Sequence, residues 1–117
     1  MRDEILASLY DIQHAGAAIM QFVDGKRRDD YETDEFLRSA VERKFEIIGE
    51  ALCRIRKVDP AILDRIREHR IVVSFRNILV HGYDSIDNQI VWGIIAEDLA
   101  RLLSDVEGLL DEAGDAE

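Results

Sequence analysis

The sequence has few of the residues that support disulfide frameworks or irregular loops, and it has no long apolar run. It contains one cysteine, Cys53, and one proline, Pro60, among 117 residues. A single cysteine excludes an internal disulfide, so nothing indicates a secreted fold. No apolar run approaches the ~18 residues of a membrane-spanning helix, and the acidic start MRDEILASLYD does not resemble a signal peptide. We therefore expect a cytoplasmic protein that does not enter a membrane.

An excess of positive charge is also missing. The chain has 25 acidic and 15 basic residues, which gives a formal net charge of −10. Since affinity for phosphates depends on clustered Lys and Arg, this balance argues against binding nucleic acid through overall charge, but it leaves a small local basic site open. The length fits one domain, which we place at residues 1–112, followed by a frayed acidic tail at 113–117.

Helical spacing of apolar residues recurs along the chain, whereas the alternating pattern of strands is absent. We expect long helices over residues 3–23, 34–57, 70–82 and from Asp87 onward, and a short helix from Pro60. Asp59-Pro60 is a typical helix start, and Gly49 indicates close helix packing. The segment KRRDDYETD between the first two helices is interpreted as a charged loop. The sequence thus predicts an all-α bundle of four long helices and one short helix.

The stretch FRNILVHGY, residues 75–83, places four polar groups of different chemistry in an apolar segment. Asn77 and His81 are one helical turn apart and face the same way. Arg76 and His81 are about 140° apart around a regular helix. They converge if the helix unwinds near Gly82, if the long arginine side chain reaches round, or if a neighbouring subunit completes the site.

The same helix has a predicted core face that includes Ile71, Phe75 and Ile78. Val73 and Val80 lie seven residues apart within its polar face. A second apolar strip of this kind indicates a second partner, most simply another copy of the chain across a two-fold axis.

A purely structural interpretation of these residues is also open. A histidine near a helix C-terminus is favourable through the helix dipole, and a glycine commonly follows the last helical residue. Arg76 has 25 acidic residues with which to pair, and Tyr83 can be a packing residue with its hydroxyl at the surface.

The segment RNILVH followed by Tyr83 has the form R-x4-H-x-Y. This resembles the motif of HEPN domains, small all-α proteins named for higher eukaryotes and prokaryotes nucleotide binding. With Tyr83 included, the pattern resembles that of the HepT toxins of HepT/MntA (HEPN/minimal nucleotidyltransferase) type VII toxin–antitoxin pairs. EIIGEAL at 46–52 is similar to the family's IGEA segment, and the spacing from HGYDSID to VWGII and DLARLL matches its last helix. The resemblance covers nearly the whole chain.

The resemblance implies a metal-independent endoribonuclease that cleaves tRNA or mRNA, needs no cofactor and works as a homodimer with its site in the interface cleft. Arg76 and His81 would be the catalytic pair and Asn77 a supporting polar residue. Tyr83 is similar to the tyrosine that the partner nucleotidyltransferase, the antitoxin, modifies with AMP.

Two other functions can be weighed against the sequence. A non-catalytic helical dimer that binds a nucleotidyltransferase or its substrate is favoured by the acidic charge, because RNA must approach against a repulsive field. The arginine–histidine pair argues against it, since a scaffold needs no such pair. A metalloenzyme is disfavoured because Glu46/Glu50 and His14/His69 form no recognised ligand set.

Overall fold

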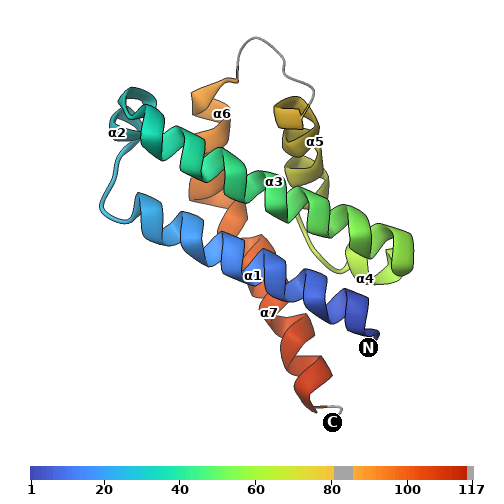
Figure 1. Ribbon diagram of the computed structural model, residues 1–117. Coiled ribbons are helices and arrows are strands. Elements are labelled where there is room, and N and C mark those ends of the chain that lie inside the picture. The colour runs from blue at the N-terminus through green and yellow to red at the C-terminus, as the bar shows by residue number, and fades with distance from the viewer. Residues whose placement is uncertain (81–85, 116–117) are drawn as a thin grey trace.

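The computed structural model describes residues 1–80 and 86–115. All regular structure in these ranges is helical, which confirms the all-α prediction. The elements are α1 (Asp3–Val23), α2 (Arg28–Thr33), α3 (Glu35–Val58), α4 (Pro60–Asp64), α5 (His69–Val80), α6 (Asn88–Gly93), the π-helical segment η1 (Ile94–Asp98) and α7 (Leu99–Asp115) (Figure 1). The last three follow one another without a break, so they form the fourth long helix. None of the described helices is long and apolar enough to cross a membrane.

Side-chain caps explain where three of the helices begin. Asp34, Asp59 and Asp87 each accept a hydrogen bond from a backbone N–H of the helix that follows, at 2.9–3.1 Å. An aspartate in this position satisfies an N–H group that has no partner within the helix. The sequence predicts the caps at Asp59 and Asp87, and for α3 it offers Thr33 or Asp34, of which the structure shows Asp34.

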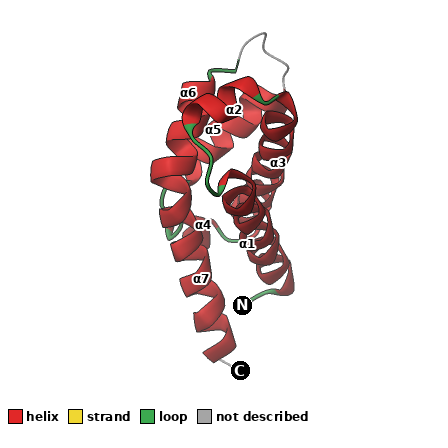
Figure 2. Cartoon of the chain, turned by 90° about the vertical axis from the view of Figure 1, so that its left-hand side faces the viewer, coloured by secondary structure: helices red, strands yellow, loops and turns green. Residues whose placement is uncertain are grey.

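Helix α3 is the centre of the bundle. It packs against α1 along its length and against α5 on another side, while α7 packs on α1 (Figures 1 and 2). Phe45 of α3 and Phe75 of α5 meet edge to face, with 5.2 Å between their ring centroids. Both rings are at most 4% exposed. This aromatic pair fixes α5 on α3.

The turn that leads into α5 is tied to α7. The backbone N–H of Arg67 donates to the Asp105 carboxylate at 2.8 Å, and its guanidinium donates to the same carboxylate at 3.0 Å. This guanidinium lowers the pKa of Asp105. Arg101 of α7 pairs with Glu68 at 3.3 Å, and Glu68 itself takes a left-handed backbone conformation with φ of 71°. The start of α5 therefore has a fixed position.

The structure corrects the predicted charged loop, because α2 lies within it. Tyr31 of α2 is fully buried, and its ring centroid lies 5.8 Å from that of Trp92. Burial raises the pKa of the Tyr31 hydroxyl. One aromatic side chain among eight polar neighbours gives no helical period, so the tertiary contact was not visible in the sequence pattern.

The predicted core face of α5 is partly wrong. Val72 and Phe75 are buried, but Ile71 and Ile78 are each 39% exposed. Val73, which the sequence pattern places in an outer apolar strip, instead packs half-buried against the core. The buried stripe of α5 is therefore rotated toward α3, the helix that α5 contacts most extensively.

Candidate active site

Arg76 lies where α5 packs closely on α3, directly over Gly49. A Cβ atom built on Gly49 would lie 2.4 Å from Cβ and 2.6 Å from Cγ of Arg76. Real Cβ atoms do not come this close, and the Arg76 Cβ is bonded directly to the α5 backbone. Only glycine at position 49 therefore allows this approach, and the glycine of the EIIGEAL segment forms the surface on which the arginine side chain rests.

The guanidinium of Arg76 extends from this contact to its neighbour in the chain. Its Nη1 donates to Oδ1 of Asn77 at 3.3 Å. Its Nε is inaccessible to solvent and has no hydrogen-bond partner among the described residues. Asn77 is exposed. The aliphatic part of the Arg76 side chain is thus held by packing, while its guanidinium keeps N–H donors available for an acceptor from solution.

Arg76 also has no carboxylate within 4.0 Å among the described residues. Seven of the twelve arginines of the chain form ion pairs in this part of the structure. The pairing that the acidic composition made conceivable for Arg76 does not occur among the described residues. An arginine that is held by packing and has no acidic partner among the described residues can donate two parallel hydrogen bonds from its planar guanidinium to two oxygens of a phosphate.

The structure brings together two of the four predicted site residues. Arg76 and Asn77 are in contact, whereas His81 and Tyr83 lie outside the described residues. Val80, one half of the predicted apolar strip, ends α5, and its side chain also lies outside them. The sequence did not reveal that Gly49 supports Arg76, although the glycine itself indicated close packing.

An apolar groove runs beside this site along α5 and the start of the last long helix. Its volume is about 310 Å³, and its walls include Ile71, Ile78, Ile90 and Ile94. Ile90 of α6 is 62% exposed, in addition to the two exposed isoleucines of α5. Clustered exposed isoleucines are unusual on a free surface and are typical of a contact surface.

Comparison with protein families decides which family the chain falls into. Residues 12–109 match the family model described as Ribonuclease HepT-like. The chain belongs to this family. It is therefore related to RNA-cleaving enzymes of the HEPN type, and the matched range contains Gly49, Arg76 and Asn77.

Individual relatives agree with this membership. A protein of Methanocaldococcus jannaschii that is named as a candidate RNase is 30% identical over 106 residues, which cover 89% of this chain and 94% of the relative. A protein of Thermococcus cleftensis named "Probable ribonuclease HepT" is 30% identical over 105 residues, which cover 86% of this chain and 91% of the relative. No solved structure matches the chain significantly.

The contact between α3 and α5 gives a direct prediction. Gly49→Ala should lower the free energy of unfolding by about 1–3 kcal/mol, because the added methyl group forces the two helices apart at Arg76. Gly108→Ala is the matched control: Gly108 lies in α7 with open space around it, so alanine should stabilise the chain by about 0.5–1 kcal/mol. Urea unfolding followed by circular dichroism measures both changes. Equal stability of the two variants would contradict the close approach.

Proposed function

We propose that this chain is the toxin of a type VII toxin–antitoxin pair, a metal-independent endoribonuclease that cleaves tRNA or mRNA at a homodimer cleft. The observation that carries the proposal is the Arg76 side chain. It rests on Gly49, contacts Asn77 and pairs with no carboxylate among the described residues. In the R-x4-H-x-Y motif this arginine precedes a histidine by five residues. Family membership supports RNA as the substrate.

The proposed reaction is a transesterification within the RNA strand. A general base removes the proton of a ribose 2′-OH, and the 2′-oxygen attacks the adjacent phosphorus. The bond to the 5′-oxygen breaks, and a general acid protonates that oxygen. The products are a 2′,3′-cyclic phosphate and a 5′-hydroxyl.

The motif residues have chemistry that suits each part of this reaction. A histidine titrates near neutral pH, so His81 can act as base or acid. The Arg76 guanidinium stays charged and stabilises the negative charge that builds up on the phosphoryl oxygens. Asn77 orients the guanidinium through the bond at 3.3 Å. One copy of the chain offers one motif histidine, so two copies would supply base and acid on opposite sides of the phosphate.

The groove of exposed isoleucines supports the homodimer. Ile71 and Ile78 line it from α5, the helix that also presents Asn77 to solvent. A second copy seated on this groove would bury the isoleucines and bring a second α5 close to the first. We therefore propose this groove, in place of a strip through Val73, as the dimer contact.

A second function has one observation in its favour, the net charge of −10. In this alternative the chain is a non-catalytic dimer that binds a nucleotidyltransferase or its substrate. The two functions differ in a simple outcome. The scaffold function is correct if the chain binds the nucleotidyltransferase in one assay and, tested without that partner, cleaves no RNA.

Loss of the catalytic pair should abolish RNA cleavage. Arg76→Gln and His81→Ala should each reduce the cleavage rate of total tRNA and a model mRNA by about 10²–10⁴-fold, because each removes a group that acts in the transition state. Gel analysis of the fragments and mass spectrometry of their ends measure rate and product. Excess EDTA should leave the wild-type rate unchanged.

Arg2→Gln and His14→Ala are matched controls, since both positions lie on α1 or just before it and outside the motif. Their rates should stay within twofold of wild type. Full activity of Arg76→Gln would remove the arginine from the mechanism, and complete inhibition by EDTA would refute the metal-free scheme.

A charge in the isoleucine groove should break the dimer. Ile78→Glu and Ile90→Glu should shift the chain from dimer to monomer in sedimentation velocity, and they should lower cleavage in parallel because the site loses its second copy. Phe36→Glu is the matched control, because Phe36 is 86% exposed but lies on α3 away from the groove. A monomeric wild type, or dimers of both isoleucine variants, would exclude this contact.

The antitoxin should act on Tyr83. Incubation with the cognate nucleotidyltransferase and ATP should attach AMP to the tyrosine hydroxyl, with release of pyrophosphate, and should stop cleavage. The added phosphate carries negative charge close in sequence to Arg76 and would compete for it. Intact-mass and peptide mass spectrometry locate the adduct. Tyr83→Phe should escape modification, whereas Tyr10→Phe, a change at an exposed tyrosine of α1, should be modified normally. An adduct on a residue other than Tyr83 would reject this mode of control.

A further inference from the structure

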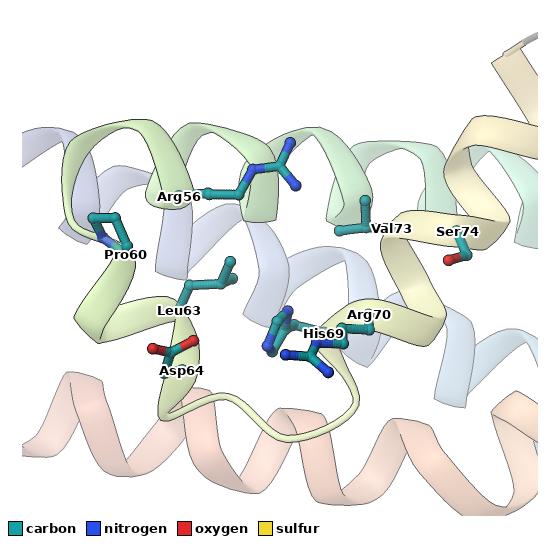
Figure 3. A pocket seen from close by; sticks show the side chains of 8 residues that line it. All are labelled: Arg56, Pro60, Leu63, Asp64, His69, Arg70, Val73 and Ser74. Carbon is teal, nitrogen blue, oxygen red and sulfur yellow. The ribbon is translucent and has the colours of Figure 1, made fainter.

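A second cavity lies at the opposite end of α5 from the motif, between α3, α4 and α5. Its volume is about 470 Å³, within the range of pockets that hold small ligands. Figure 3 shows the α4 side chains facing those of α5 across the cavity, with the Arg56 guanidinium extending from α3 toward α5. The lining residues are Arg56, Pro60, Leu63, Asp64, His69, Arg70, Val73 and Ser74.

The walls of this cavity carry more positive than negative charge, in contrast to the chain as a whole. Arg56 and Arg70 line it, and neither has a carboxylate within 4.0 Å among the described residues. Asp64 is the one acidic residue among the eight that form the lining. On a chain with a net charge of −10, two arginines that face one opening mark a local site for an anion.

The positive charges of the cavity also affect the pKa of His69. His69 begins α5, is partly buried and lies next to Arg70 on the side of the cavity opposite α4 (Figure 3). Burial lowers the pKa of His69, and the positive charges of Arg70 and Arg56 lower it further, against the opposing effect of Asp64. A neutral imidazole in this position offers a flat ring on which a base can stack.

The cavity ends within one helical turn of the candidate active site on α5. Val73 and Ser74 form its edge, and Asn77 follows them by four and three residues. Residues at these spacings are neighbours on a helix surface. Arg70 and Arg76 are six residues apart, about 9 Å along the helix axis at 1.5 Å per residue. The two positions are also about 120° apart around a regular helix, so an RNA strand that reaches both arginines has to run partly round α5 as well as along it.

We propose that this cavity binds one nucleotide of the RNA substrate, a short distance along the strand from the phosphate that is cut. Arg56 and Arg70 bind its backbone phosphate, and Asp64 accepts a hydrogen bond from a ribose hydroxyl. His69, Leu63 and Pro60 contact the base. This assignment rests on the proposed function, and it explains how an acidic chain holds a polyanion: the charge needed is confined to two arginines and Arg76.

Binding of RNA to a chain that does not cut it tests the assignment. In the His81→Ala background, a fluorescein-labelled single-stranded RNA is titrated against the full chain at several salt concentrations. Arg56→Gln/Arg70→Gln should bind about tenfold more weakly. The slope of log affinity against log salt should become shallower by about 1.4, because each arginine that no longer neutralises a phosphate removes roughly 0.7 from it. Lys26→Gln/Lys57→Gln removes the same charge at exposed positions outside the cavity and should change affinity less than twofold.

A second measurement has one arm, in the His81→Ala chain alone, that does not depend on how the arginine variants fold. The imidazole NMR signals of His69 in the His81→Ala chain should shift when the RNA is added, and Arg56→Gln/Arg70→Gln should suppress that shift. Unmoved His69 signals, or an affinity loss equal to that of the lysine control, would overturn the assignment. Tighter binding of free AMP than of RNA at His69 would also overturn it, because the ligand would then be a mononucleotide.

Different experimental outcomes would refute the cavity assignment and the nuclease function. If the wild type cuts no RNA but the labelled strand still shifts His69 and depends on Arg56 and Arg70, the nuclease function fails and the cavity stands. If the wild type cuts RNA and the double arginine variant binds it like the lysine control, the cavity assignment fails and the nuclease function stands.

Discussion

The contact between Gly49 of α3 and Arg76 of α5 is the constraint on which the candidate site depends. Two helices approach so closely that one side must lack a Cβ atom, and the arginine side chain is held in the resulting contact. The edge-to-face pair of Phe45 and Phe75 holds the same two helices together. Among the described residues, packing on Gly49 holds the aliphatic part of the Arg76 side chain, and the hydrogen bond to Asn77, rather than an acid, positions its guanidinium. A charge that is oriented in advance needs little reorganisation when a phosphate arrives.

Helix α5 contributes residues to the core, to the apolar groove and to the polar cavity. Its buried stripe, with Val72 and Phe75, joins the core, its exposed isoleucines line the apolar groove, and its first turn borders the polar cavity. Arg70 and Ser74 line both the groove and the cavity. A second copy in the groove would therefore lie next to the proposed nucleotide site. The ion pairs of Arg67 and Arg101 hold the start of α5 against α7. They therefore help to maintain the relative positions of the three surfaces.

The sequence predicted those parts of the fold that are governed by local chemistry. Aspartate caps and helical spacing placed the long helices, and the motif pointed to Arg76 and Asn77. The pattern failed where a tertiary contact decides. Tyr31 lies in a helix because its ring is buried against the last long helix, and Ile78 is exposed because α5 turns a narrower stripe to α3. Arg56 and Arg70 are distant in the chain, so only the folded structure shows that they share a cavity.

The ion pairing of most arginines has a consequence for how the chain meets other polyanions. In the part of the chain that the structure describes, seven of the twelve guanidinium groups pair with neighbouring acids, and the chain as a whole keeps a net charge of −10. This balance of charge disfavours unspecific attraction to the phosphates of nucleic acids. Under the proposed function, an RNA strand would therefore be held by the few arginines that have no acidic partner among the described residues, and not by attraction to the surface as a whole.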